Sequence, residues 1–139
     1  MSIHYAISAR LFEQYNRENI IKILKNGSEK GCIYFPDIWP QESKVNPLSL
    51  DEAASLIQEN LAREDELPCL LTQIEDTLIY VFIKKTEENN LIVTLTPLAS
   101  MWVMNDSHGS SKIDFARYIK VLLGLINGFS IEHLESIAE

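Results

Sequence analysis

The residues best suited to bind a metal ion are few and widely spaced in this 139-residue chain. The candidate ligands are three histidines, His4, His108 and His133, and two cysteines, Cys32 and Cys69. No histidine stands one helical turn from another histidine or from a cysteine, although a zinc site normally draws two ligands from one turn or tight loop. We therefore expect no metal site and no metal cofactor.

The sequence also contains no clear motif for nucleophilic or acid–base catalysis. Residues 107–111 set serine hydroxyls beside His108, but neighbours in a loop do not readily form a nucleophile–base pair, and no Gly-x-Ser-x-Gly elbow is present. The five glycines are isolated, without the Gly-x-Gly pattern that cradles phosphate. Glu75 and Asp76 lie in a polar turn, whereas acid–base catalysis by two carboxylates requires burial. We expect no enzyme and no cofactor.

The charge is negative and unevenly distributed. The net charge is −8 and the pI is about 4.9, the wrong sign for nucleic acid or an anionic membrane surface. Residues 1–48 hold six basic and five acidic side chains, whereas residues 49–139 hold six basic and fifteen acidic ones. The acidic runs 64–66, 75–76 and 87–88 are either solvated turns or parts of one acidic face.

The expected elements begin with alternating strands and helices. Alternating apolar residues predict a strand over residues 3–12. Asn16 is the expected N-cap of a helix that Gly27 ends in a left-handed conformation. Residues 32–35 form a short buried strand that Pro36 stops.

A second helix and a run of strands follow. Ser49 and Glu52 have the spacing of a capping box, which opens a helix. Strands are then expected over residues 69–74, 78–84 and 91–96, joined by short polar turns as a β-meander. The middle strand is apolar on both faces and should be central.

The C-terminal third is predicted to be largely helical. Residues 101–104 extend the sheet or cap its edge, and residues 105–111 form a mobile loop. Helical spacing of apolar residues predicts a long helix over 115–126 that Gly128 ends, and a last short helix over 131–137, which Ser130 would cap.

Together these elements predict an α+β fold in one domain, residues 1–139. The order is β-α-β-α-β-β-β-α-α, with an antiparallel β-meander sheet and helices packed mainly on one side, in two layers. No signal peptide and no apolar run of about 18 residues is present. Cys32 and Cys69 lie in apolar runs, which favours buried reduced thiols and a cytoplasmic location.

Because we expect no metal site, no cofactor and no catalysis, we interpret the sequence as that of a binding protein. Trp39 lies in a loop between Pro36 and Pro40 and is either a contact residue or part of the core. Tyr34 and Trp102 are better explained as core residues, and Tyr15 is a further aromatic candidate. An aromatic centre with a carboxylate rim would suit a basic protein partner.

The architecture resembles small acidic bacterial immunity proteins of contact-dependent or secreted toxin systems. The resemblance rests on size, the acidic half, the lack of a catalytic motif, and the helical pattern of residues 113–123. It implies a protein that neutralises a cognate toxin domain, here a basic and nuclease-like one. The hypothetical partner-binding residues are Trp39, Glu42, Glu64, Asp65, Glu66, Glu75, Asp76 and Asp106.

A second family is also similar in size and pI. Bacterial secretion chaperones are small, acidic α+β proteins that act as homodimers and bind extended effector segments. A homo-oligomer is left open for this chain and is not predicted. Genomic context would separate the two interpretations. A neighbouring toxin gene would favour an immunity protein, and a neighbouring effector gene would favour a chaperone.

Overall fold

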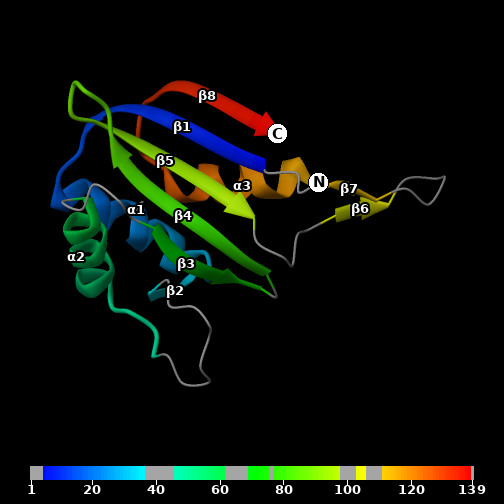
Figure 1. Ribbon diagram of the computed structural model, residues 1–139, viewed down its shortest axis with the longest axis horizontal. Coiled ribbons are helices and arrows are strands. Elements are labelled where there is room, and N and C mark those ends of the chain that lie inside the picture. The colour runs from blue at the N-terminus through cyan, green and yellow to red at the C-terminus, as the bar shows by residue number, and fades with distance from the viewer. Residues whose placement is uncertain are drawn as a thin grey trace.

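The computed structural model describes residues 5–36, 46–61, 69–75, 77–97, 103–105 and 111–138. Its elements, in chain order, are β1 (Tyr5–Gln14), α1 (Arg17–Glu29), β2 (Ile33–Pro36), α2 (Leu50–Leu61), β3 (Cys69–Ile74), β4 (Thr77–Lys85), β5 (Asn90–Pro97), β6 (Val103–Asn105), β7 (Ser111–Ile113), α3 (Phe115–Leu125) and β8 (Ile131–Ala138). Six strands form one sheet with the helices behind it, and β6 and β7 form a separate pair (Figure 1).

The main sheet is antiparallel and has the strand order β2-β3-β4-β5-β1-β8. β3, β4 and β5 follow one another in the chain and in the sheet, so the predicted β-meander is confirmed, with its boundaries shifted by only one residue. The predicted central strand, β4, lies in the interior of the sheet. The predicted fold class, α+β with an antiparallel sheet and helices mainly on one side, is confirmed.

One face of the sheet is buried against the helices. Along β4 burial alternates strictly: Ile79, Val81 and Ile83 are buried, and the residues between them are partly exposed. α1, α2 and α3 supply the other half of the core through apolar stripes. The helical members of this core are Ile20, Ile23, Leu24, Ala53, Ala54, Ile57, Tyr118, Leu122 and Leu125.

The predicted starts of two helices are confirmed. The Asn16 side chain accepts a hydrogen bond from the Asn19 N–H at 2.8 Å at the start of α1. At the start of α2, the Glu52 N–H donates to Ser49 Oγ and the Ser49 N–H donates to Glu52 Oε1, each at 3.1 Å. These bonds satisfy backbone donors that a helix leaves without an internal partner.

Arg17 joins α1 to α2. Its guanidinium donates to Gln58 Oε1 at 2.9 Å and to Ser55 Oγ at 3.1 Å. It also donates to the Asp51 carbonyl oxygen at 3.2 Å and lies 3.5 Å from the Asp51 carboxylate. One side chain at the start of α1 therefore holds both the first and the second turn of α2.

The prediction that Gly27 ends α1 is wrong. The helix continues past it, and Gly31 takes the left-handed conformation with φ of 96°. Gly27 is instead buried against β2, where an added Cβ would overlap the Tyr34 hydroxyl and lie 2.5 Å from Leu125 Cδ2. Tyr34 Oη donates to the Leu24 carbonyl at 2.7 Å. The close approach of this tyrosine explains why a glycine stands inside the helix.

The prediction of a last helix over residues 131–137 is also wrong, because this segment is β8, paired antiparallel with β1. Ser130 does not cap a helix. Its N–H donates to the Glu13 carboxylate at 2.8 Å, and its carbonyl accepts from the Phe12 N–H at 2.9 Å. The edge of β1 offers a full ladder of backbone hydrogen bonds, which outweighs the helical spacing of a segment too short to be stable alone. The predicted element order is corrected accordingly, with three helices in the described chain rather than four.

Two other predictions hold in part. The predicted strand at 32–35 is β2, but it lies at a sheet edge, and Ile33 is 43% exposed although Tyr34 is buried. Within the predicted segment 101–104, the described part belongs to β6, which pairs with β7 and does not extend the main sheet. The structure does not describe residues 106–110, most of the predicted loop.

The predicted cytoplasmic location rested on the lack of a membrane-spanning segment and on two buried, reduced cysteines. None of the described helices is long and apolar enough to cross a membrane. Cys32 is a free, buried thiol, as predicted. The side chain of Cys69 lies outside the described part of the chain.

Candidate functional site

An exposed aromatic ring lies at one end of the sheet. Phe12, near the end of β1, is 59% exposed, the highest value among the large exposed hydrophobic residues that the structure describes. Its backbone is held on both sides, because its N–H donates to the Ser130 carbonyl at 2.9 Å and its carbonyl accepts from Asn90 Nδ2 at 2.6 Å. An exposed ring on a fixed backbone suits a binding contact, since little conformational entropy is lost when it is covered.

Acidic and basic residues both occur near Phe12. Arg10 is exposed on the same side of β1, and the Glu13 carboxylate, on the other side, accepts a hydrogen bond from the Ser130 N–H. Glu87 and Glu88 are exposed in the β4–β5 turn. The Tyr15 N–H fastens that turn to β1 by donating to the Asn89 carbonyl at 2.7 Å, and Asn89 takes a left-handed conformation with φ of 67°. We call the residues Phe12, Glu13, Glu87 and Glu88 the Phe12 end.

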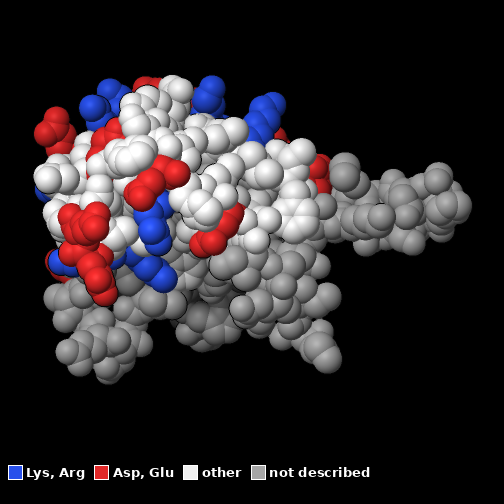
Figure 2. Space-filling view, turned by 90° about the horizontal axis from the view of Figure 1, so that it is seen from above, with Lys and Arg blue, Asp and Glu red and all other residues white. Residues whose placement is uncertain are grey.

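The acidity of the Phe12 end is local. Lys84 and Lys85 lie at the end of β4, close to the same turn. On the surface seen in Figure 2, acidic side chains form several separate groups with basic side chains between them. The described residues therefore show two exposed acidic residues, Glu87 and Glu88, in the turn beside Phe12, and no continuous acidic face on the side of the molecule in view.

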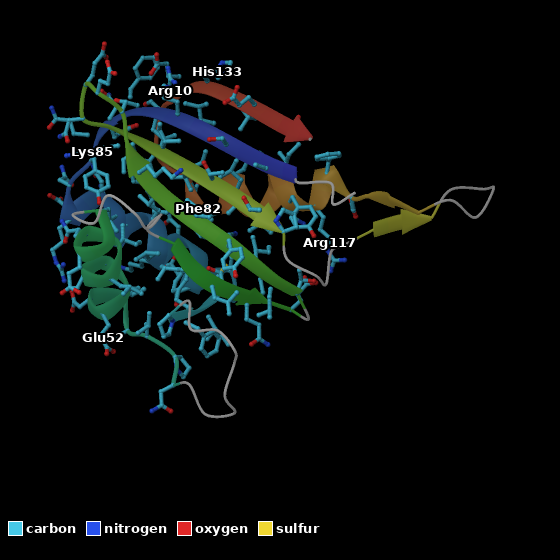
Figure 3. All side chains as sticks on the ribbon, in the orientation of Figure 1. Arg10, Glu52, Phe82, Lys85, Arg117 and His133 are labelled. Carbon is cyan, nitrogen blue, oxygen red and sulfur yellow. The ribbon has the colours of Figure 1, made fainter. Side chains whose placement is uncertain are left out.

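The open face of the sheet, opposite the helices, carries aromatic side chains. The rings of Tyr80 and Phe82 on β4 are tilted, with centroids 6.2 Å apart, and Lys84 Nζ lies 5.3 Å from the Phe82 centroid (Figure 3). Beside them, Ser8 Oγ and Thr94 Oγ1 share a hydrogen bond of 2.9 Å across β1 and β5. This face is partly exposed and of mixed polarity.

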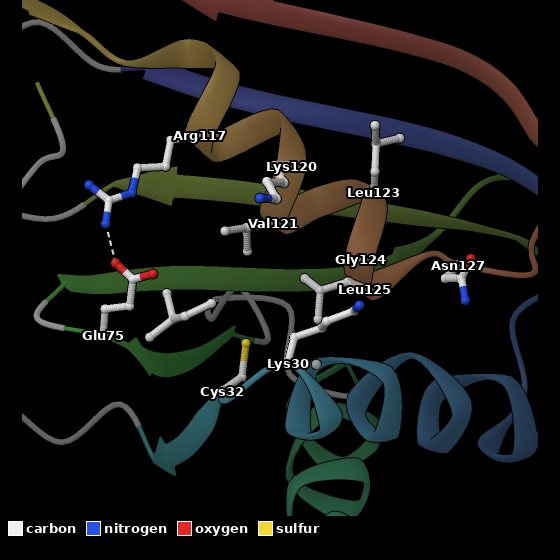
Figure 4. Close-up of a pocket in the computed structure, with 12 residues that line it drawn as sticks. Lys30, Cys32, Glu75, Arg117, Lys120, Val121, Leu123, Gly124, Leu125 and Asn127 are labelled. Atoms are coloured by element: carbon white, nitrogen blue, oxygen red, sulfur yellow. Dashed lines mark hydrogen bonds and ion pairs between the residues drawn. The ribbon is translucent and has the colours of Figure 1, made fainter. Parts of the chain in front are cut away.

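A cavity of about 510 Å³ lies between α1, α3 and the ends of β2 and β3 (Figure 4). Volumes of this size accommodate small molecules. Apolar side chains and Cys32 form part of the wall, and the charged residues are Lys30, Glu75, Arg117 and Lys120. The Glu75 carboxylate forms an ion pair with the Arg117 guanidinium.

Cys32 is the thiol among these wall residues. Burial raises the pKa of the Cys32 thiol to about 11, so the thiol is protonated at neutral pH and is a poor nucleophile. Within the described chain, no cluster of three histidine, cysteine or acidic residues could hold a metal ion. The wall of the cavity combines apolar side chains with three basic side chains and one acidic one.

Glu75 is the only predicted partner-binding residue whose side chain the structure describes. It lies in the β3–β4 turn with φ of 55° and faces Arg117 at the cavity, so its neighbours are basic. It is not part of the Phe12 end. The other predicted contact residues lie outside the described chain: Trp39, Glu42, Glu64, Asp65, Glu66, Asp76 and Asp106.

The sequence interpretation missed Phe12 as a candidate contact. The predicted alternation over residues 3–12 turns Ile7 toward the core and, continued, turns Leu11 inward and Phe12 outward. Leu11 is fully buried and Phe12 exposed, as this alternation requires. A large aromatic residue on the outward side of a strand end was the available signal. The prediction that Tyr34 belongs to the core is confirmed.

Comparison with known proteins finds no matching family model, no similar curated protein and no similar solved structure.

Proposed function

We propose that this chain is an immunity protein that binds and neutralises a cognate antibacterial toxin domain with a basic, nuclease-like surface. Binding would occur in the cytoplasm of the cell that makes the immunity protein. The observation that carries the proposal is the Phe12 end, where the most exposed large hydrophobic side chain described in the structure lies beside the turn that carries Glu87 and Glu88. The net charge of −8 supports a basic partner.

The aromatic ring and the carboxylates at such a surface would have different roles. A desolvated aromatic side chain at the centre of an interface contributes most of the affinity. Carboxylates at the rim raise the association rate with a basic partner and select against acidic ones. A nuclease domain must present a cationic surface to hold nucleic acid, so an acidic protein can bind and cover that surface.

The test begins with the reading frames next to this gene and uses a toxin domain encoded there. Co-expression of the full chain should restore growth to cells that produce the toxin domain. The two purified proteins should form a one-to-one complex that weakens as salt is added, because exposed charges are screened beyond about 10 Å at 0.1 M ionic strength. No complex and no protection would refute the proposal.

The central contact is tested by Phe12→Ala. We expect it to weaken the complex by about 30-fold, as for an interface hot spot. Ile33→Ala is the control, because Ile33 is an exposed apolar residue on β2, at the opposite edge of the sheet. Equal effects of the two variants would place the contact elsewhere.

The carboxylates are tested by charge reversal. The double variant Glu87→Lys/Glu88→Lys should slow association and reduce its salt dependence, whereas Glu29→Lys on α1 should change neither. A triple reversal of Glu64, Asp65 and Glu66 to Lys tests the acidic run that the sequence singled out. If only the triple variant slows association, the contact surface includes that run in place of the β4–β5 turn.

A secretion chaperone is the alternative, and one observation favours it. β8 is a long strand at a free edge of the sheet in the described chain, and extended peptides bind to such edges. A chaperone would protect a fragment of an unfolded effector from proteolysis. An immunity protein would instead bind a folded toxin domain, so limited proteolysis with each client separates the two functions.

A further inference from the structure

β8 leaves one side of its backbone unpaired by any strand in the described chain. It is the last strand of the order β2-β3-β4-β5-β1-β8 and pairs with β1 alone. It lies along the outer edge of the sheet in Figure 1. The opposite edge, β2, has four residues, whereas β8 has eight. A long edge strand offers a row of backbone donors and acceptors to another strand.

The side chains of β8 leave this edge accessible to a strand of matching pattern. Ile131 and Leu134 are each 41% exposed, the strand contains neither lysine nor proline, and its ionisable side chains are Glu132, His133 and Glu135. The register with β1 sets Leu134 opposite Ala9, a core residue, and His133 opposite Arg10. Leu134 therefore belongs to the helix-covered face of the sheet and His133 to the open face.

The sequence of β8 is complementary to itself in one antiparallel register. With Leu134 opposite Leu134 of a second copy, His133 of each copy stands opposite Glu135 of the other. Ile131 lies beyond an irregularity in the β1–β8 ladder, between Arg10 and Leu11, so the self-complementary stretch is residues 133–135. An imidazole N–H can donate to a carboxylate, and such polar pairs, like apolar pairs, stabilise a sheet when they lie directly across two strands.

Neighbouring registers are worse. A shift of one residue sets Glu132 opposite Glu135 or Leu134 opposite Glu135, depending on its direction. A shift of two sets Glu135 opposite Glu135 or His133 opposite His133. Carboxylates directly opposite each other repel and destabilise a strand pair, and the registers that set Leu134 opposite Glu135 or His133 opposite His133 lose the imidazole–carboxylate pairs. The charge pattern therefore selects the register centred on Leu134.

We propose that β8 pairs antiparallel with β8 of a second copy of this chain, around a two-fold axis at Leu134. The two six-stranded sheets then form one continuous sheet, and both helix layers lie on the same side of it. Within one chain His133 Nε2 already lies 3.5 Å from Glu135 Oε2, and in the dimer each imidazole gains the second copy's carboxylate. The Phe12 end and its function do not enter this argument.

The test is the mass of the full purified chain in solution by sedimentation equilibrium, measured over a range of micromolar concentrations. A monomer–dimer equilibrium is expected. His133→Glu places like charges opposite each other twice and should raise the dimer dissociation constant by about tenfold or more. The double variant H133E/E135H restores two imidazole–carboxylate pairs and should bring the constant back near that of the unaltered chain.

Controls separate register from general charge effects and from misfolding. Lys25→Glu, on the exposed side of α1, should leave the constant unchanged, and circular dichroism of each variant should match that of the unaltered chain. Hydrogen exchange at β8 should slow as the protein concentration rises. A chain that stays monomeric, or a dimer that H133E and H133E/E135H weaken equally, would overturn the proposal, and neither result depends on a toxin.

Discussion

Gly27 shows how one missing side chain can determine local packing. The backbone of α1 passes so close to β2 that the Tyr34 hydroxyl occupies the place of a Cβ. The hydroxyl is fixed there because it donates to the Leu24 carbonyl. An alanine at this position would improve helix propensity but would push the tyrosine out of a buried hydrogen bond.

We therefore expect Gly27→Ala to lower the free energy of unfolding by about 1–3 kcal/mol, the usual penalty for overpacking a core. Gly124→Ala is the matched control on α3, where the nearest atom to an added Cβ is Lys30 Cγ at 3.6 Å. It should raise stability by up to about 1 kcal/mol, the helix propensity gain of alanine over glycine. Urea denaturation measures both. Equal changes would contradict the packing explanation.

Cys32 makes stability sensitive to alkaline pH. Burial raises its pKa from 9.0 to about 11, so the folded protein keeps a proton that the unfolded chain loses. The free energy of unfolding should then fall as pH rises from about 9 to about 11, by roughly 2 kcal/mol. Burial also raises the pKa of Tyr34, which adds a loss at still higher pH.

Urea denaturation between pH 8 and pH 11 checks this dependence. Cys32→Ala removes the thiol, so its stability should fall less steeply between pH 9 and pH 11 than that of the unaltered chain. The comparison uses the slopes, because the substitution also changes stability at neutral pH by altering the core. Identical slopes would mean that the thiol does not contribute.

Among the elements, those with local signals were predictable from the sequence. α2 begins where Ser49 and Glu52 form their two reciprocal hydrogen bonds, and the three meander strands follow their apolar runs. β8 was not predictable in this way. Its apolar spacing fits a helix, and only its pairing with β1, at the other end of the chain, makes it a strand.

The capping box supplies a prediction at this scale. Ser49→Ala should lower the free energy of unfolding by about 1 kcal/mol, because it removes the acceptor for the Glu52 N–H. Ser28→Ala is the control, since Ser28 lies exposed in the last turn of α1 and is not an N-cap. Thermal unfolding of both variants measures the difference. If Ser28→Ala destabilises as much, the cap is not the cause.

For the whole molecule, charge counting indicated a basic partner but not the surface that meets it. Net charge is a sum over the sequence, whereas a contact surface depends on which turns the fold brings together. Glu75 illustrates the difference: its sequence neighbour is acidic, but its partner in space is Arg117. The turn that carries Glu87 and Glu88 lies beside Phe12 because hydrogen bonds tie it to β1, a contact that no local pattern specifies.

The pairing of β1 with β8 also has a consequence for folding. Tyr5 lies opposite Ala138, so this ladder closes the longest loop in the described chain, and contacts so distant in sequence form slowly. β1 pairs with β5 on one side and must wait for β8 on the other. Until β8 arrives, the edge of β1 is free to capture a strand from another folding chain. The interval before β8 docks is therefore when a newly made molecule is most vulnerable to misassembly.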